Sequence, residues 1–211
     1  MIKKKFCIIG IDNDFLDFIK RNKSLFSGYY SENNRFYKSI IKRKRLGTHD
    51  KKNWLKVKKK INPDVVICID NGAIREKLYK SIYKNNCKNL FFKKSHISET
   101  SKLRLLKKKC IIIQDHAKIM SNVNIDSGVK IHVGVQIHHD CTIGKFSTIA
   151  PKALLLGNVK IGSHAYIGAN ATIKQRIKIG KGAIVGAGAV VVKNVKNFDI
   201  VVGSPARSIK N

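Results

Sequence analysis

From residue 123 to residue 191 this chain repeats every six residues, and few folds can accommodate such a period. One position of each hexad is a large branched aliphatic residue, namely Ile125, Ile131, Ile137, Ile143, Ile149, Leu155, Ile161, Ile167, Ile173, Ile179, Val185 and Val191. An α-helix needs a period of about 3.6 residues and a hairpin strand a period of two, so neither explains a sustained six. Short parallel strands wound into a three-sided prism do explain it, because each hexad then supplies one side and one corner. The repeat therefore predicts a parallel β-helix with three hexads, or eighteen residues, in each coil.

Two further positions of the hexad have a consistent character. The residue two places before each large aliphatic is small or aliphatic, as at Val135, Cys141 and Ala153. A glycine often follows the large aliphatic, as at Gly144, Gly162, Gly168, Gly180 and Gly186. We expect the large side chains to fill the axis of the prism and the small ones to fit beside them. We expect glycine to permit the dihedral angles of the corners.

The first part of the chain has a different pattern, in which apolar strand-like runs alternate with helical stripes. Strands are predicted at 6–10, 25–30, 65–69 and 89–92, and helices from residue 15 and over 74–83. Residues 31–60 are interpreted as a lysine-rich, poorly patterned connection. This alternation predicts a small Rossmann-like parallel sheet with helices on its faces.

Two domains are therefore expected, an α/β domain over residues 1–94 and the β-helix over residues 95–211. The six-residue rhythm begins near 95–97, is interrupted by the basic stretch 102–109 and settles from Ile113. Residues 198–207 are expected to leave the β-helix as an extended tail.

Composition excludes several functional classes. The net charge of +30 comes mainly from dispersed lysines, whereas recognition of bases or phosphates favours arginine, and no nucleic-acid-binding motif occurs. Nucleic acid is therefore not the expected partner, and binding of a polyanion or nucleic acid through the lysines is the lesser alternative. The five cysteines are odd in number and form no CxxC pair, which indicates reduced thiols in a cytoplasmic protein. The N-terminal apolar run is too short for a signal peptide, and no stretch approaches the roughly 20 apolar residues of a membrane span.

The clearest departure from the repeat is His138-His139-Asp140, which replaces the usual small corner residues. An imidazole next to a carboxylate is the arrangement of a general base with an orienting partner. With eighteen residues per coil, Gly157 stacks on His139, and a glycine there leaves a slot and a bare backbone N–H for an oxyanion. The alternative is that the two histidines are exposed corner residues with no catalytic role.

A second column of small residues could form a groove for a thin, extended ligand; it consists of Pro151, Ala169 and Ala187. Zinc is not expected, because a catalytic zinc needs three protein ligands. His132 and His138 occupy equivalent positions on adjacent sides of the prism, so they point in different directions. The pair of histidines separated by four residues that γ-type carbonic anhydrases present is also missing.

Several segments resemble the NeuD/PglD-type sugar O- and N-acetyltransferases, and the resemblance extends over nearly the full length. They are Gln136-Ile-His-His-Asp-Cys-Thr-Ile-Gly144, Gly157-Asn-Val-Lys-Ile-Gly162, residues 184–191, Val202-Gly-Ser-Pro-Ala-Arg207 and, upstream, Ile69-Asp-Asn-Gly-Ala-Ile-Arg75. The resemblance implies a left-handed β-helix and acetyl-CoA as the donor. It also implies a sugar acceptor that the N-terminal domain binds.

The resemblance assigns roles to individual residues. The catalytic base falls on His139 and its acidic partner on Asp140, while Cys141 is expected to be part of the wall rather than a nucleophile. Thr148 stands where the family has a second histidine that touches acetyl-CoA. The remaining acetyl-CoA contacts fall on Gly157, Ala169 and Ala187.

The acceptor side departs from the family pattern. Of the glycine-rich turn after the first strand, only Gly10 remains. Asp12, Asn13 and Asp70 are candidates to line a changed acceptor pocket; the alternative is that they are ordinary loop and cap residues.

The sequence thus predicts an acetyl-CoA-dependent sugar acetyltransferase, with a nucleotide-linked 4-amino sugar of surface-glycan biosynthesis as the favoured acceptor. One alternative is O-acetylation of a sialic or nonulosonic acid. Another is a non-catalytic assembly protein that kept only the β-helix. A homotrimer is expected, because a three-sided rod commonly buries one side against copies of itself.

Overall fold

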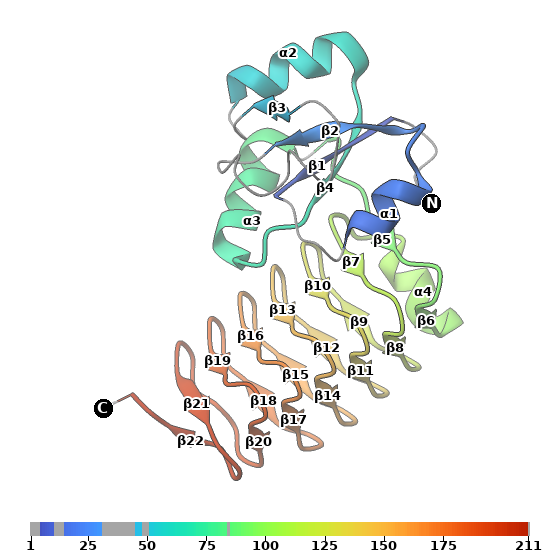
Figure 1. Cartoon of the computed structure of the whole chain (residues 1–211). Coiled ribbons are helices and arrows are strands. Elements are labelled where there is room, and N and C mark those ends of the chain that lie inside the picture. The colour runs from blue at the N-terminus through green and yellow to red at the C-terminus, as the bar shows by residue number, and fades with distance from the viewer. Residues whose placement is uncertain (1–4, 11–14, 31–44, 48–50, 84, 211) are drawn as a thin grey trace. The chain divides into compact units, whose positions relative to one another are not determined.

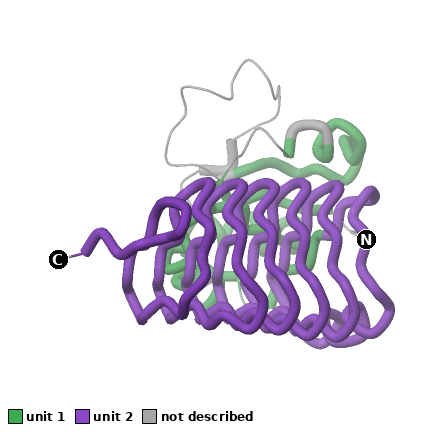
Figure 2. Tube along the Cα trace, turned by 90° about the horizontal axis from the view of Figure 1, so that it is seen from below, with its two compact units in different colours: residues 1–90 green, residues 91–211 purple. Residues whose placement is uncertain are grey.

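A computed structural model describes residues 5–10, 15–30, 45–47, 51–83 and 85–210. The chain divides into two compact units, residues 1–90 and residues 91–211 (Figure 2). The strand predicted at 89–92 is present as β5 (Leu90–Phe91), but its placement was wrong: it joins the β-helix beside β7 (Ile112–Ile113) instead of the N-terminal sheet. No helix in the described ranges combines the length and the hydropathy that a bilayer crossing needs.

The first unit contains the predicted parallel sheet. Its strands are β1 (Phe6–Ile9), β2 (Phe26–Tyr30), β3 (Arg45–Gly47) and β4 (Asp64–Ile67), in the order β3-β2-β1-β4 (Figure 1). All neighbouring strands are parallel. The four residues of β1 are fully buried, as expected for the central strand of a sheet covered on both faces.

Helices α1 (Leu16–Arg21) and α3 (Gly72–Leu78) appear where helices were predicted, and α3 continues into the π-helical turn η2 (Tyr79–Tyr83). Helix α2 (Lys51–Ile61) was not predicted, because it lies in the stretch interpreted as an unpatterned connection. Lysine-rich composition hides a short apolar stripe there: Trp54 is buried, and its ring meets Tyr83 edge-on with a centroid distance of 5.0 Å.

The second unit is the predicted β-helix, with three parallel faces among its described residues (Figure 1). The six-stranded face consists of β6 (His96–Ile97), β8 (Lys118–Ile119), β11 (Gln136–Ile137), β14 (Leu154–Leu155), β17 (Thr172–Ile173) and β20 (Val190–Val191). The four-stranded face consists of β9 (Asn124–Ile125), β12 (Thr142–Ile143), β15 (Lys160–Ile161) and β18 (Lys178–Ile179). The eight-stranded face consists of β5, β7, β10 (Lys130–Ile131), β13 (Thr148–Ile149), β16 (Tyr166–Ile167), β19 (Ile184–Val185), β21 (Ile200–Val202) and β22 (Arg207–Ser208).

The register confirms the coil of eighteen residues. Ile137 pairs with Leu155 on one face, and Ile143 pairs with Ile161 on the next. The predicted large aliphatics and the small residues beside them are buried and form one continuous core along the axis. Each fully buried Ile or Leu contributes roughly 1.5–3 kcal/mol, so this column is the main source of stability in the unit.

The expected role of the repeat glycines was wrong in detail. The left-handed dihedrals occur two places further on, at positions that include Asn122, Asp140, Phe146 and Asn158. Glycine follows the aliphatic for a different reason: a Cβ at Gly162 would lie 2.5 Å from the Lys181 nitrogen of the next coil. These glycines therefore permit the close approach of successive coils rather than an unusual backbone angle.

The two ends of the β-helix depart from the repeat. Helix α4 (Glu99–Leu105) accounts for the predicted interruption after β6, and its Leu105 is buried in the axial core. The expected extended tail at 198–207 was only partly correct. There β21 continues the eight-stranded face beside β19, and β22 turns back to pair antiparallel with β21.

Candidate active site

Three edges separate the faces of the prism, and the predicted site residues fall on two of them. The His139 edge, which carries His139, Asp140 and Gly157, lies between β11 of the six-stranded face and β12 of the four-stranded face. The alanine edge lies between the eight-stranded and six-stranded faces and carries Pro151, Ala169 and Ala187. The third, or phenylalanine, edge carries Gly128, Phe146 and His164.

His139 and Asp140 form a direct pair at their edge. The distance between His139 Nδ1 and Asp140 Oδ2 is 2.8 Å. An ionised carboxylate has no proton to give, so Nδ1 is the donor and Nε2 is left as the acceptor of a proton. The His139 side chain is 59% exposed, which leaves its ring accessible to a ligand.

The pKa of the Asp140 carboxyl is lowered, first by its hydrogen bond to His139. Desolvation opposes this effect, while a hydrogen bond from the Asn122 side chain and the positive charge of Arg104 reinforce it. The carboxylate is therefore ionised at neutral pH and can hold the imidazole in one tautomer.

Gly157 stacks on His139 one coil further along, as the register predicted. A Cβ on Gly157 would lie 2.7 Å from His139 Nε2 and 2.8 Å from its Cε1, so any other residue would collide with the ring. Within the described part of the chain the Gly157 N–H donates no hydrogen bond. His139 Nε2 thus lies directly against Gly157, which is itself buried.

The alanine edge has a similar row of backbone donors. Pro151 and Ala169 lie on consecutive coils, since the Asn170 N–H donates to the Pro151 carbonyl oxygen over 3.0 Å. Among the described residues, neither the Ala169 nor the Ala187 N–H donates a hydrogen bond. Because this edge and the His139 edge border opposite sides of the six-stranded face, one copy of the chain does not bring the two columns together.

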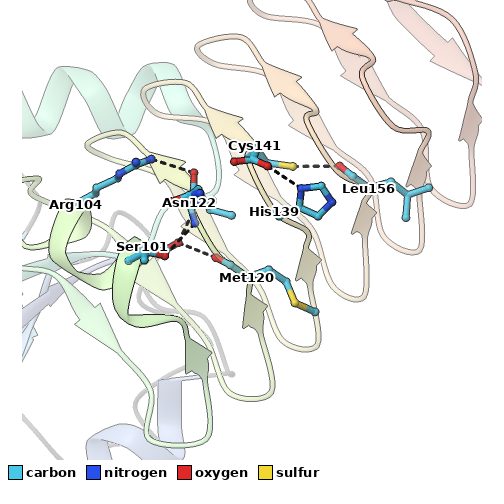
Figure 3. A network of polar contacts seen from close by, with 10 residues as sticks. Ser101, Arg104, Met120, Asn122, His139, Cys141 and Leu156 are labelled. Carbon is cyan, nitrogen blue, oxygen red and sulfur yellow. Dashed lines mark hydrogen bonds and ion pairs between the residues drawn. The ribbon is translucent and has the colours of Figure 1, made fainter.

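Cys141 is part of the wall. Its Sγ donates to the Leu156 carbonyl oxygen over 3.1 Å (Figure 3). Burial raises the pKa of this thiol to about 11, so it is protonated at neutral pH and is a poor nucleophile. All five cysteines lie in the described residues, where none forms a disulfide and each is buried.

The other predicted site residues lie apart from the His139 edge. Thr148 is buried in β13, on the eight-stranded face rather than on an edge. In the first unit Asp70 is exposed after β4, where its carbonyl oxygen accepts a hydrogen bond from Arg75 Nη1 over 2.9 Å. Asp12 and Asn13 lie outside the described residues. Over the described ranges, no cluster of three or more His, Cys, Asp or Glu side chains is suited to holding a metal ion.

Gly10 is required by the backbone at the carboxyl end of β1. Its φ is +70°, and a Cβ there would lie 2.7 Å from Ile69 Cγ1. The turn after β1 therefore packs closely on the turn after β4, which is where open parallel sheets usually bind their ligands.

Asn122 and Arg104 belong to the surroundings of the site, and sequence reasoning did not find them. Asn122 lies eighteen residues before Asp140, so the repeat period could have indicated it. Arg104 lies in α4, outside the regular repeat, and no sequence signal connects it with Asp140.

Comparison with known proteins supports the fold. Residues 158–193 match the bacterial transferase hexapeptide (six repeats) family. The acetyltransferase domain of PglB from Neisseria gonorrhoeae FA1090, in complex with acetyl coenzyme A, has a TM-score of 0.82 at 20% identity, covering 98% of this chain and 100% of that one. PerB from Caulobacter crescentus, in complex with CoA and GDP-perosamine, has a TM-score of 0.84 at 19% identity, covering 99% and 98%. WeeI from Acinetobacter baumannii AYE has a TM-score of 0.73 at 25% identity, covering 98% and 100%.

The chain thus has a left-handed β-helix of six-residue repeats, preceded by a Rossmann-like sheet. It shares this architecture with PglB and PerB over almost the whole length of both structures. The resemblance identified in the sequence is confirmed at the level of the fold.

Proposed function

We propose that this protein transfers the acetyl group of acetyl-CoA to an amino group of a nucleotide-linked 4-amino sugar in surface-glycan biosynthesis. The observation that carries the proposal is the orientation of His139. Its Nδ1 is held by Asp140 at 2.8 Å, while its Nε2 lies against Gly157, which has no side chain to displace it. Solved structures of the same fold contain acetyl-CoA in PglB, and CoA with GDP-perosamine in PerB.

In this proposal His139 is the general base. Nε2 removes a proton from the acceptor amine as the amine nitrogen attacks the thioester carbonyl carbon. A C–N bond forms, the negative charge moves to the carbonyl oxygen, and the Gly157 N–H stabilises it. When the oxyanion collapses, the C–S bond breaks and the sulfur leaves with the proton that His139 returns. Asp140 keeps the imidazole oriented and compensates its positive charge.

The alanine edge is proposed to hold the pantetheine arm of the donor through the free N–H groups of Ala169 and Ala187. Thr148, which is buried in the adjoining face, remains a predicted donor contact. A hollow of about 590 Å³ at the C-terminal end of the β-helix is lined by Lys193, Lys196, Arg207 and Lys210, among others, and suits the donor's phosphates. It lies three strand spacings from His139 along the axis, about 14 Å.

Because donor and base columns lie on different edges, the proposed site needs a second copy of the chain. In a cyclic trimer with the six-stranded face toward the axis, the His139 edge of one copy meets the alanine edge of the next. The outward side chains of that face include Leu154 and Val190 but also the exposed Lys118, and the four-stranded face presents exposed Lys160 and Lys178. We assign the interface to the six-stranded face because the His139 edge and the alanine edge both border it. Light scattering should give the mass of a trimer; a monomer at micromolar concentration would contradict this arrangement.

The acceptor is assigned to the first unit, at the carboxyl ends of β1 and β4. Gly10 and the exposed Asp70 lie there, and Asp12 and Asn13 stay candidate contacts on the sequence alone. Free, buried thiols and an acetyl-CoA donor are consistent with a cytoplasmic enzyme.

A thiol-release assay tests the function directly. Purified protein is mixed with acetyl-CoA and, in separate reactions, a panel of nucleotide-linked amino sugars, a sialic acid and buffer alone. Release of CoA with a nucleotide-linked amino sugar supports the proposal, and release only with the sialic acid would favour O-acetylation instead. If calorimetry detects no binding of acetyl-CoA or of any nucleotide sugar, the protein is a non-catalytic assembly component.

A further inference from the structure

Helix α4 occupies the place of a strand in the first coil of the β-helix. The chain passes from β6 on the six-stranded face through α4 to β7 on the eight-stranded face. The four-stranded face begins only at β9, and α4 lies against β9. At this level of the prism, hydrogen bonds that a strand would make must therefore come from somewhere else.

Side chains of α4 supply them at one corner (Figure 3). On later coils the corner N–H donates to a carbonyl of the coil before, as Asp140 does to Ser121 over 3.1 Å. Asn122, one coil before Asp140, has no such preceding coil. Its N–H donates to Thr100 Oγ1 over 3.1 Å, and its carbonyl oxygen accepts from Arg104 Nη1 over 3.0 Å.

Ser101 fixes the residues on either side of Asn122. The buried Ser101 Oγ donates to the Met120 carbonyl oxygen over 2.7 Å and accepts from the Val123 N–H over 2.9 Å. The corner from Met120 to Val123 is thus held at both ends and in the middle by three side chains of a single helix.

The candidate catalytic pair, His139 and Asp140, lies one coil further along, next to this corner. The Asp140 N–H donates to the carbonyl oxygen of Ser121, the residue beside Asn122, and the Asn122 side chain is among the groups that lower the pKa of the Asp140 carboxyl. The Asp140 carboxylate in turn binds His139 Nδ1. A continuous chain of contacts therefore runs from α4 through Asn122 and Asp140 to the imidazole.

We propose that Asn122 is a positioning residue for the Asp140–His139 pair and that α4, through Thr100, Ser101 and Arg104, holds Asn122 in place. This inference rests on the proposed function, because it assigns a role in orienting the base of that reaction.

The variant Asn122→Gly tests the proposal without straining the backbone. Asn122 has a φ of 58°, which glycine adopts freely and alanine does not. We expect kcat to fall roughly tenfold, as for loss of one hydrogen bond to a charged group, with an unchanged KM for acetyl-CoA. His116→Gly is the matched control, because His116 is also an exposed corner residue with a φ of 61°. It should keep wild-type kcat. Equal losses in both variants would overturn the proposal.

The contribution of α4 is tested by a second matched pair. Arg104→Ala removes a cation that contacts Asn122, whereas Lys102→Ala removes one from the same helix whose side chain pairs with Glu99, at 3.4 Å. Arg104→Ala should lower kcat a few-fold and Arg104→Lys should restore part of it, while Lys102→Ala should have no effect. Indistinguishable Arg104→Ala and Lys102→Ala enzymes would contradict a role for α4.

A double-mutant cycle and a spectrum separate this proposal from the proposed function. If Asn122 acts through Asp140, Asn122→Gly should lower kcat no further in an Asp140→Asn background; additive losses would overturn the proposal.

Long-range ¹H–¹⁵N NMR spectra should show neutral His139 protonated at Nδ1 in the wild type and a tautomer mixture in Asn122→Gly. Unchanged tautomers would also contradict it. The NMR measurement of the His139 tautomer does not depend on turnover, so it tests the proposal even if no acetyl transfer is found.

Discussion

The His139 edge and the phenylalanine edge use the same geometric device for different purposes. At each, an aromatic ring lies against a glycine of the neighbouring coil: His139 against Gly157, and Phe146 against Gly128. The Phe146 ring is buried and stacks on His164 with a centroid distance of 5.9 Å. The His139 ring is exposed and bound to a carboxylate.

The comparison separates ring–glycine contacts that stabilise the β-helix from those that could take part in catalysis. A buried apolar ring against glycine fills a space and contributes packing energy. An exposed imidazole whose Nδ1 is held by a carboxylate keeps Nε2 as its proton acceptor. Substitutions at the phenylalanine edge should therefore change the free energy of unfolding, and substitutions at the His139 edge should change turnover.

The largest effect is expected from His139→Ala. Loss of a general base typically lowers turnover by roughly 10²–10⁴-fold, and the exposed ring contributes little packing. Steady-state kinetics should show this loss while thermal denaturation shows a wild-type midpoint. An active His139→Ala enzyme would remove the distinction between the two edges.

Gly128→Ala should destabilise the fold rather than lower turnover. The new Cβ would lie 2.2 Å from the Phe146 ring, and the residue has a φ of +78°. Overpacking of this kind costs about 1–3 kcal/mol in the free energy of unfolding. Urea denaturation measures it, and the folded fraction should retain wild-type kcat.

Gly157→Ala should have the opposite profile. Its Cβ would displace the His139 ring or fill the slot, so we expect kcat/KM to fall about tenfold, or about 1.4 kcal/mol. The free energy of unfolding should change little, because the exposed ring can move aside. A strongly destabilised Gly157→Ala protein with normal kinetics would mean that the His139 edge, like the phenylalanine edge, contributes to packing and not to catalysis.

The smallest effect concerns pH. The hydrogen bond to His139 lowers the pKa of Asp140 below its ordinary 3.8, so folding favours the ionised carboxylate. The resulting stabilisation is fully present above the ordinary pKa and is lost as the pH falls through the lower folded value. Thermal midpoints of wild type and Asp140→Asn should differ slightly at neutral pH and converge in strong acid. A difference that grows in acid would contradict this sign.

Much of the second unit could be predicted because its information is periodic. Every sixth residue has the same environment. The spacing of Ile137, Ile143 and Leu155 therefore predicts which side chains fill the axis, where the faces lie and how many residues one coil contains. The same arithmetic placed Gly157 against His139. In the first unit the strands could be predicted from short apolar runs, but Trp54 and its helix were hidden among lysines.

By itself, then, the sequence determined the wound prism, its core and the neighbours that lie one coil apart, because each of these depends on a repeated local spacing. Only the tertiary structure decided which corner positions take left-handed dihedrals. It alone decided that Arg104 acts on the His139 edge through Asn122. These contacts join an aperiodic helix to a periodic corner, and side-chain contacts between such segments depend on packing in space rather than on spacing along the chain.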